Sequence, residues 1–291
     1  MLTLFTIPPE SKAEKIQISR TNALTSWLRL NPACEIILFG GGDELASLAA
    51  ARPQIRHVPD VARSNLGTPL LGDAFQRAQV MARGDVLMFS NCDMLYFDDL
   101  QSTIGQVTFP IYMLCGRRWD LEVPGLVAPE DHTGWSRLRS RYANDGKMHG
   151  PGGLDFFIFP RSLHIEIPPF VVGRPGWDSW LMWRMRSLGV PVIDATGAIT
   201  ALHQNHDYSH LKHGAKQYTG SEMQANYHLA GGYRNMLGLR ESNWVFSDGV
   251  LRRPAWPLRI FSLLAPTWPY RFALAGKRHL QRKIAAVLAA K

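Results

Sequence analysis

The sequence predicts an α/β protein with a mostly parallel central sheet and helices on both of its faces. Short apolar runs alternate with longer helical patterns through the first hundred residues, which is typical of parallel strands joined by crossover helices. Apolar residues make up 46% of the 291 residues and charged residues 19%, an ordinary composition for a globular protein with a core. The length fits one large domain, or one domain with an extension.

The first half contains four predicted strands and three predicted helices. Leu2–Ile7 is an apolar, β-branched run closed by Pro8 and Pro9, so it is the first strand. A helical pattern over 11–30 follows, and Asn31-Pro32 ends it. The other predicted strands are 35–39, 55–58 and 85–89, separated by a short helix after residue 42 and a helix over 68–82.

The second half is less regular. Its predicted strands are 108–114, 155–159 and 191–194, and its predicted helix is 178–188. From about residue 214 the pattern becomes helical and is interrupted by Trp and Pro. We therefore expect a main domain over 1–213 and a helical, basic extension over 214–291.

The positive charge is concentrated in the C-terminal segment. The whole chain carries 32 Lys and Arg against 24 Asp and Glu, a net charge of +8. Residues 251–291 contain nine basic residues and no acidic one, so residues 1–250 carry a net charge of −1. A nucleic-acid enzyme spreads positive charge along its binding face, so we expect no nucleic-acid partner.

Cysteine usage and hydropathy indicate a compartment. Cys34, Cys92 and Cys115 are odd in number and lack metal-binding spacing, which favours a reducing cytoplasm over a disulfide scaffold. No apolar run approaches 18 residues, and the N-terminal residues lack the basic segment of a signal peptide. We expect a cytoplasmic protein, either free or peripheral on the inner face of the membrane.

Three polar motifs follow predicted strands or begin helices. Asn91-Cys92-Asp93 follows the strand 85–89, where ligands bind in parallel sheets. A carboxylate there can hold a divalent cation that neutralises a diphosphate, although Asn and Asp are also common turn residues. Asp178 begins a helix, where it is either a first-turn acid or a general base, and Trp177 beside it offers a ring for a sugar face.

The densest polar cluster has four histidines. Their spacing of i, i+3, i+7 and i+10 would line one helical face and form a zinc site. The cluster also follows a strand-like run, which favours a loop in which one histidine is a metal ligand. The four residues are His203, His206, His210 and His213.

The order of these motifs resembles the GT-A fold glycosyltransferases, and among them family 2-like sequences of bacterial and viral surface polysaccharide synthesis. The resemblance covers roughly residues 1–213. It rests on Asn65-Leu66-Gly67, alanines at 74, 78 and 82, the run Arg83–Asp93, Gly153–Arg161, Trp177-Asp178-Ser179-Trp180, and His203–His210. It implies a nucleotide-binding half over 1–100 and an acceptor half over 101–213.

The resemblance also implies a role for individual residues. In this family a D-x-D-like motif binds the donor diphosphate through Mn²⁺ or Mg²⁺. Here Asn91 replaces the first Asp, so Asp93 is the principal metal ligand, and His203 or His206 completes the site. The implied nucleotide contacts are Thr6, Pro8, Arg20, Asp43, Asn91 and Asp93, the implied sugar or acceptor contacts are Asp120, Gly153, Asp155 and Trp177, and the implied base is Asp178.

The function implied is transfer of a sugar from a UDP-, GDP- or dTDP-sugar to a hydroxyl of a glycan or lipid-linked glycan, with inversion. Two alternatives stay open. The chain is a non-catalytic carbohydrate-binding or assembly protein on a degenerate GT-A fold if Asn91 marks a lost metal site. It is a metal-dependent hydrolase if the histidine cluster converges on one ion.

The basic C-terminal segment has two interpretations. Nine cations lie among Trp256, Phe261, Trp268, Tyr270 and Phe272, a mixture suited to the surface of an anionic membrane. The same segment equally fits a pair of helices that packs on the main domain and exposes its Lys and Arg side chains to water.

Overall fold

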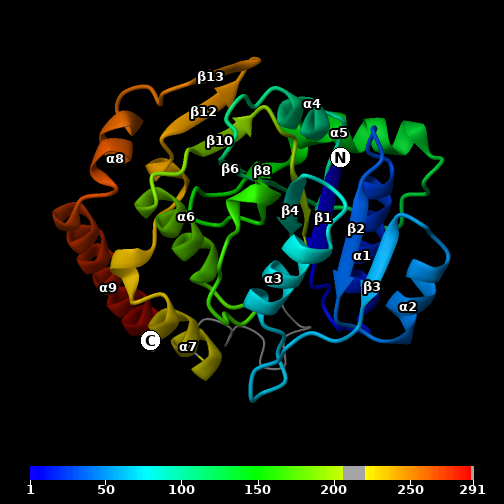
Figure 1. Ribbon diagram of the computed structural model, residues 1–291, viewed down its shortest axis with the longest axis horizontal. Coiled ribbons are helices and arrows are strands. Elements are labelled where there is room, and N and C mark those ends of the chain that lie inside the picture. Colours follow the sequence, from blue (N-terminus) through cyan, green and yellow to red (C-terminus); the bar gives the residue numbers. More distant parts are fainter. Residues whose placement is uncertain (206–219, 290–291) are drawn as a thin grey trace.

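A nine-stranded sheet forms the centre of the computed structural model, which describes residues 1–205 and 220–289, with side chains through Gln281 (Figure 1). The strand order across the sheet is β13-β12-β10-β6-β9-β4-β1-β2-β3. Helices cover both faces of the sheet. The predicted α/β class with a mostly parallel sheet and flanking helices, which the GT-A resemblance also implies, is therefore confirmed.

One half of this sheet is parallel and follows the predicted strands closely. β1 pairs with β2 on one side and with β4 on the other, both parallel, and β2 pairs with β3. The strands are β1 (Leu2–Thr6), β2 (Glu35–Phe39), β3 (Ile55–Val58) and β4 (Val86–Ser90). The helices between them are α1 (Glu14–Leu28), α2 (Asp43–Ala50) and α3 (Leu71–Met81).

The other half begins with one antiparallel strand. β9 (Phe156–Pro160) runs antiparallel to β4 and to β6 (Met113–Cys115). β10 (Val192–Gly197) then pairs in parallel with β6 and with β12 (Trp244–Ser247), and β13 (Val250–Arg252) closes the edge. β6 starts later than predicted because Pro110, which has no backbone N–H, precedes it.

A second, four-stranded sheet was not predicted. Its order is β5-β11-β7-β8. Its strands are only two or three residues long, too short for hydrophobic alternation to show in the sequence. They are β5 (Met94–Leu95), β7 (Trp119–Leu121), β8 (Lys147–Met148) and β11 (Leu202–Gln204). Through the pairing of β5 with β11, this small sheet joins the segment after β4 to a segment more than a hundred residues later in the chain.

The core has two layers, one on each face of the large sheet. Alternate residues of a strand point to opposite faces, so Phe5 of β1 lies in one layer and Leu4 in the other. α3 and α6 (Trp177–Ser187) cover the first layer. α1, α2, α4 (Asp99–Gly105) and α5 (His132–Asp145) cover the second.

Two corrections concern the remaining elements. α4 and α5 were not predicted, because α5 buries only Trp135 and Leu138 and therefore shows little apolar periodicity. The segment 214–291 is not an all-helical extension, since β12 and β13 lie in it and extend the large sheet. Its helical elements in the described part are α7 (Ser221–Leu229), η3 (Tyr233–Asn235), η4 (Leu239–Glu241), α8 (Leu258–Leu264) and α9 (Trp268–Ala289).

α8 and α9 pack on the rest of the protein through one face each. The Tyr270 hydroxyl donates to Glu241 Oε1 at 2.6 Å, and Arg278 donates to the Met236 carbonyl at 2.7 Å. Arg186 of α6 donates to the Ser262 carbonyl at 2.6 Å. Packing on the core is thus established for this segment. Among the described residues, no helix is both long and apolar enough to cross a bilayer.

Candidate functional site

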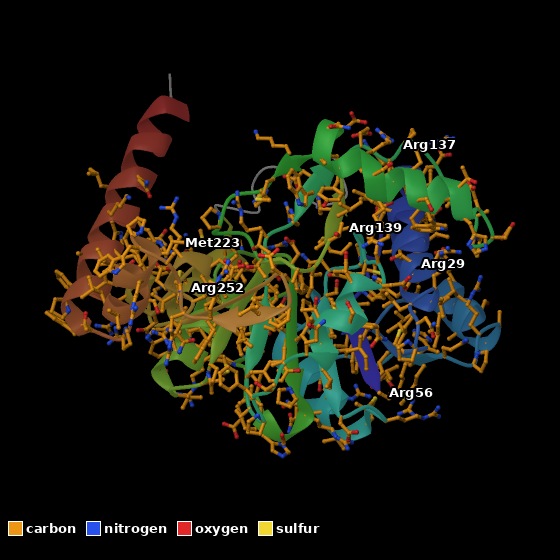
Figure 2. All side chains as sticks on the ribbon, turned by 90° about the horizontal axis from the view of Figure 1, so that it is seen from above. Arg29, Arg56, Arg137, Arg139, Met223 and Arg252 are labelled. Carbon is orange, nitrogen blue, oxygen red and sulfur yellow. The ribbon has the colours of Figure 1, made fainter. Side chains whose placement is uncertain are left out.

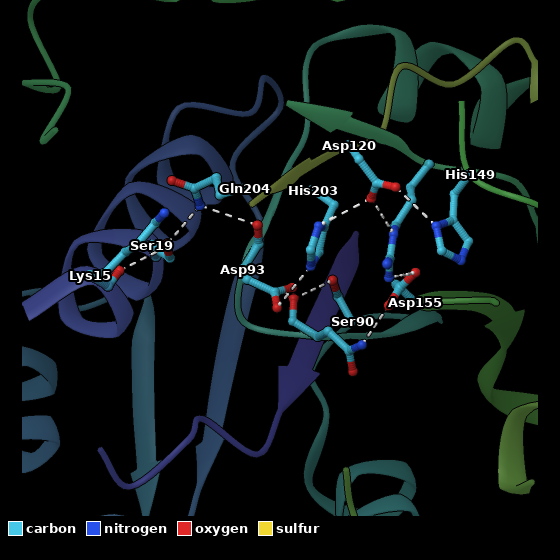
Figure 3. A network of polar contacts seen from close by, with 11 residues as sticks. Lys15, Ser19, Ser90, Asp93, Asp120, His149, Asp155, His203 and Gln204 are labelled. Carbon is cyan, nitrogen blue, oxygen red and sulfur yellow. Dashed lines mark hydrogen bonds and ion pairs between the residues drawn. The ribbon is translucent and has the colours of Figure 1, made fainter. Parts of the chain in front are cut away.

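The small sheet places Asp93 beside His203. Asp93 lies between β4 and β5, and β11 pairs antiparallel with β5, which sets His203 opposite Met94. Gln204 reinforces this placement, because its backbone N–H and its side-chain amide both donate to the Asp93 carbonyl, at 3.2 and 3.1 Å. His203 Nε2 then lies 3.5 Å from Asp93 Oδ2 (Figure 3).

Asp120 contacts the other nitrogen of the same imidazole. β7 pairs in parallel with β11, with Asp120 opposite His203, and Asp120 Oδ1 lies 3.2 Å from His203 Nδ1. Two further side chains contact this carboxylate: Arg118 Nε lies 2.9 Å from Oδ1, and His149 Nδ1 lies 2.9 Å from Oδ2. Asp120 was predicted to contact sugar hydroxyls, which stays a prediction, and its oxygens contact His203, Arg118 and His149 (Figure 3).

Asp155 is likewise engaged by protein groups. Its Oδ2 lies 2.6 Å from Arg118 NH1, and its Oδ1 accepts a hydrogen bond from Asn91 Nδ2 at 2.7 Å. The backbone N–H of Asn91 also donates to the Asp155 carbonyl, at 2.9 Å. Arg118 therefore bridges Asp155 and Asp120, and the predicted sugar contact Asp155 is 6% exposed. Asn91 is a donor to a carboxylate, a function that an aspartate in its place would not fulfil.

Buried hydrogen bonds fasten the network to α1. Gln204 Nε2 donates to the Ser19 carbonyl at 2.7 Å, and Asn22 Nδ2 donates to Gln204 Oε1 at 3.0 Å. The Ser19 hydroxyl in turn donates to the Lys15 carbonyl at 2.9 Å (Figure 3). Gln204, the residue after His203 in β11, is thereby tied to α1, a helix of the parallel half.

The network stabilises the charged forms of His203 and Asp120. Burial disfavours the imidazolium form of His203, but Asp93 and Asp120 outweigh burial and raise its pKa to about 9. Burial also acts on Asp120, yet hydrogen bonds from His203 and His149, with Arg118 nearby, lower its pKa below the usual range. A positive charge at the His203 imidazole, whether from a proton or from a metal ion, is stabilised by the carboxylates of Asp93 and Asp120.

Asp178 lies in the first turn of α6, as predicted, and is partly buried. Burial, with the nearby negative charge of Asp155, raises its pKa to about 6, while hydrogen bonds with the backbone of Ser179 and Leu154 act in the opposite direction. A carboxylate with a pKa near 6 is ionised at neutral pH and is a stronger base than an ordinary aspartate. The Asp178 side chain is thus electrostatically coupled to Asp155, and through Asp155 to Arg118.

Trp177 is a core residue, and its predicted role as a platform for a sugar ring is wrong. Its side chain is 6% exposed and lies in the core layer under α3 and α6. Its ring meets the rings of Phe89 and Phe157 edge to face, with centroids 5.2 and 5.4 Å apart. A surface buried among phenylalanines has no room for a sugar.

The predicted nucleotide contacts lie at the edge of the sheet where β1, β2 and β4 end. Thr6 and Pro8 are buried at the end of β1, and Thr6 lies beside Cys92. Arg20 is almost fully buried and forms an ion pair with Glu44 in the first turn of α2. Asp43, the preceding residue, is exposed. The chain order reverses between β1 and β4, and this switch point is where open α/β sheets bind ligands.

Gly153 lies against His149 in the network. A Cβ atom at this position would lie 2.8 Å from His149 Nε2, so a side chain there would require the imidazole to shift. The absence of a side chain at residue 153 therefore lets the His149 imidazole approach Asp120. The close approach of His149 is a structural explanation for a glycine at residue 153, in addition to its predicted role of contacting a sugar.

The metal-ligand prediction is partly within the described structure. Asp93 and His203 face each other, whereas His206, His210 and His213 lie outside the described residues. Within residues 1–205 and 220–281, no group of three or more His, Cys, Asp or Glu side chains is placed to hold a metal ion. The two donors nevertheless suit Mn²⁺ or Mg²⁺, which bind through one or two protein ligands plus substrate phosphates.

Asp120 strengthens this fit. A histidine that binds a metal through one nitrogen normally donates its other N–H to a carboxylate, which fixes the ring and its tautomer. Asp120 on Nδ1 leaves Nε2 directed at Asp93.

Sequence reasoning missed Arg118, His149 and Gln204 as members of the site. Each acts through strands of two or three residues that bring distant segments together. The one local signal was that two polar residues, His203 and Gln204, follow each other in a buried strand. Burying a polar side chain costs free energy unless it is hydrogen-bonded, so a buried Gln204 requires hydrogen-bond partners.

Comparisons with known proteins add little at the level of sequence. No family model and no curated protein matches the chain. Among solved structures, it is similar to residues 1–349 of S. aureus TarS in complex with UDP-GlcNAc, with 12% identity over 71% of this chain and 59% of that chain, and a TM-score of 0.44. The present chain thus spans less than two thirds of the length of that protein.

A second similar structure is glucosyl-3-phosphoglycerate synthase from Mycobacterium tuberculosis in complex with Mg²⁺ and uridine diphosphate. Identity is 16% over 80% of each chain, with a TM-score of 0.43. A structure described as a mycobacterial protein matches with 16% identity over 80% of this chain and 75% of that chain, with a TM-score of 0.42. Similarity this low supports no functional conclusion, so the function is argued from the site.

Proposed function

We propose that the protein is a nucleotide-sugar glycosyltransferase that transfers a sugar to a hydroxyl of a glycan or lipid-linked glycan with inversion. The observation that carries this proposal is the group Asp93, His203 and Asp120 at the carboxyl end of β4, beside the topological switch point. The order of motifs that resembles the GT-A glycosyltransferases supports it. The donor is a UDP-, GDP- or dTDP-sugar.

The residues at the switch point have distinct roles in this proposal. Thr6, Pro8, Arg20 and Asp43 frame the nucleoside at the ends of β1 and β2. Asp93 and His203 hold Mn²⁺ or Mg²⁺, which when bound offsets negative charge on the diphosphate. Asp120 fixes the His203 ring, and Arg118 links Asp120 to Asp155.

Asp178 is the general base. Its carboxylate takes the proton of the acceptor hydroxyl, and the hydroxyl oxygen forms a bond to the anomeric carbon. The bond between that carbon and the diphosphate oxygen breaks on the opposite face, and the nucleoside diphosphate leaves with the bonding electrons. The products are the inverted glycoside, the nucleoside diphosphate and protonated Asp178. A pKa of about 6 keeps Asp178 ionised and ready at neutral pH.

The binding-protein alternative rested on Asn91, and the structure supplies another reason for that residue. Its amide donates to Asp155 at 2.7 Å, which an aspartate would replace with repulsion between two carboxylates. Asn91 is therefore compatible with an intact metal site built on Asp93. The hydrolase alternative depends on His206, His210 and His213, which lie outside the described residues.

A thermal-shift screen with UDP, GDP, dTDP and CMP, each with and without Mn²⁺, tests the proposal. A ligand that binds only the folded protein raises its melting temperature. We expect a shift with one nucleotide that requires Mn²⁺ and is lost in Asp93→Ala. Asp98→Ala is the matched control, because Asp98 is an exposed carboxylate five residues further along. No shift with any nucleotide at millimolar concentration, or an equal loss in Asp98→Ala, overturns the proposed donor site.

A further inference from the structure

Exposed apolar side chains are concentrated in the C-terminal helices. Of the fifteen large hydrophobic residues exposed in the described chain, eight lie between residues 256 and 280. Single exposed apolar residues are common on soluble proteins, but such a concentration in one short segment marks an interaction surface. The residues are Trp256, Leu258, Ile260, Leu263, Leu264, Trp268, Phe272 and Leu280.

α8 has one face on the protein and an apolar face on the outside. Ser262 and Ala265 are buried, and Arg186 holds the Ser262 carbonyl. At about 100° per residue, Ile260, Leu263 and Leu264 lie on the side of the helix opposite to Ser262 and Ala265. These three residues are exposed, so the outward face of α8 is apolar where a surface helix normally carries polar residues.

α9 continues this surface with an aromatic pair. Trp268 and Phe272 stack on each other, with ring centroids 5.1 Å apart, and both are about 60% exposed. Tyr270 and Arg278, on another side of the helix, contact Glu241 and the Met236 carbonyl. Figure 2 shows α9 projecting from the body of the molecule on the side away from α5, whose Arg137 is labelled. The pair therefore belongs to a helix at the margin of the molecule and is exposed there.

The charge of the segment is as distinctive as its hydropathy. Residues 251–291 carry nine basic and no acidic residues, whereas residues 1–250 carry a net charge of −1. Arg271 and Arg278 are partly buried, and they contact Asn235 and the Met236 carbonyl. Arg259 on α8 and Lys277 on α9 are exposed. At about 100° per residue, Arg259 lies beside Leu263 on the apolar side of α8, whereas Lys277 lies on the side of α9 away from Trp268.

We propose that the exposed faces of α8 and the first half of α9, together the α8–α9 face, dock on the surface of an anionic phospholipid bilayer. Lysine and arginine attract anionic headgroups, while Trp and aliphatic side chains enter the boundary between headgroups and acyl chains. The helices lie on the membrane and do not cross it, in agreement with their length and composition. In each helix, the side chains that pack on the protein and those that dock on lipid lie on different faces. The segment therefore packs on the protein and binds the membrane at the same time.

Charge and exposure favour lipid over a protein partner. A protein partner would bind the apolar helix face in a groove, and it would pair particular Lys and Arg side chains with acidic side chains at fixed positions. Here exposed aromatic and aliphatic residues lie beside the exposed Arg259 in a segment with no acidic residue, which a fluid anionic surface accommodates without fixed partners.

Co-sedimentation with vesicles tests the proposal, using the full chain. We expect binding to vesicles of phosphatidylcholine with phosphatidylglycerol, much weaker binding to phosphatidylcholine alone, and release by salt. Trp268→Ser with Phe272→Ser should weaken binding at least tenfold, because these rings bury the largest apolar area. Arg259→Glu should weaken it at least fivefold, since each charge near such a surface contributes about fivefold.

Two variants elsewhere serve as matched controls. Val80→Ser alters an exposed apolar residue on α3, and Arg137→Glu reverses an exposed cation on α5. Both should bind vesicles like the unaltered protein, and circular dichroism should show that all variants are folded. Failure of the unaltered protein to sediment with phosphatidylglycerol vesicles overturns the proposal. So does self-association, measured by light scattering, that depends on Trp268 and Phe272 while vesicle binding does not. Neither readout uses catalysis, so the result stands apart from the proposed function.

Discussion

Asn91 and Asp155 form a hydrogen bond in which the amide Nδ2 donates to the carboxylate at 2.7 Å. The backbone of Asn91 also donates to the Asp155 carbonyl, so the two residues are joined twice. This pair connects the loop after β4 to the start of β9, and Arg118 connects it further to Asp120. The donor character of residue 91 is therefore a structural requirement of the network.

Replacing Asn91 with aspartate should destabilise the protein. Asn91→Asp exchanges a hydrogen bond to a charged group for a pair of facing carboxylates, and we expect a loss of about 2–3 kcal/mol in the free energy of unfolding at pH 8. The introduced carboxyl would have a raised pKa when folded, so its destabilising effect is complete above that pKa and declines as the pH falls. Urea unfolding at pH 8 and pH 5 measures both effects. Asn144→Asp, at an exposed position on α5, should change stability by less than about 0.5 kcal/mol. Equal stability of Asn91→Asp and the unaltered protein at pH 8 would contradict this account.

Asp178→Asn should increase stability while it removes activity. The pKa of Asp178 is raised from 3.8 to about 6, so the folded protein binds this proton more tightly than the unfolded chain. Stability contributed by the protonated form is complete below about pH 4 and is lost as the pH rises through about 6. The variant should therefore be more stable than the unaltered protein above pH 6, by at most about 3 kcal/mol, and nearly equal at pH 4. Thermal unfolding across this pH range is the measurement.

The same variant should lose glycosyl transfer, measured as release of nucleoside diphosphate with acceptor present. In the unaltered protein, transfer should fall as the pH drops below about 6, because the base becomes protonated. Retained transfer in a folded Asp178→Asn protein would exclude Asp178 as the base.

Asp120→Asn should weaken binding of Mn²⁺ without abolishing folding. The substitution removes the carboxylate that holds His203 Nδ1 at 3.2 Å, and loss of such a partner typically lowers metal affinity by tenfold or more. Titration calorimetry with MnCl₂ gives the affinity. His149→Gln, which alters the contact to the other Asp120 oxygen, should have a smaller effect. If Asp120→Asn bound Mn²⁺ as tightly as the unaltered protein, Asp120 would not position a ligand.

Trp177 and Trp268 offer a direct comparison of a buried and an exposed tryptophan. Trp177→Ala should cost about 3–5 kcal/mol in unfolding free energy, because its ring is 6% exposed and packs on Phe89 and Phe157. Trp268→Ala should change stability by under about 1 kcal/mol, because that ring is 60% exposed. Chemical denaturation of both variants measures the difference. A small cost at Trp177 would mean that its ring is not part of the core.

Tyr270→Phe should loosen the packing of α9. The Tyr270 hydroxyl donates to the buried Glu241 at 2.6 Å, and removing a hydrogen bond to a charged group costs about 1.5–3 kcal/mol. Tyr142→Phe is the control, since the Tyr142 ring packs on Trp119 and the change should cost less. Differential scanning calorimetry would detect the loss as a lower melting temperature. An equal effect of the two substitutions would argue against a specific role for the Tyr270 hydroxyl.

Regular elements with strong apolar periodicity could be predicted from the sequence. β2 and β3 have the predicted bounds, because five- and four-residue buried strands lie between clear turn residues. α5 could not be predicted, since it buries too few residues to show a pattern. The β12–β13 hairpin had an overlooked signal: Asp248-Gly249, both with positive φ angles of 54° and 71°, is a typical hairpin turn.

The candidate site was predictable only in part. Asp93, His203 and Asp178 were identified by residue type next to strand and helix boundaries. Arg118 and His149 were not identified, because their positions depend on the pairing of very short strands whose register no local pattern encodes. The substrate contact predicted for Asp120 stays a prediction, and its contacts with Arg118 and His203 could not be predicted for the same reason.

The pairing of β5 with β11 has a consequence for how the protein is made. Asp93 and Gln204 are 111 residues apart, so a chain emerging from the ribosome carries the parallel half long before its partner strand exists. Contacts so distant in sequence form late and slowly. The parallel half should therefore form first around β1 and β4, and the contact between Asp93 and His203 should form only after about two thirds of the chain has been made.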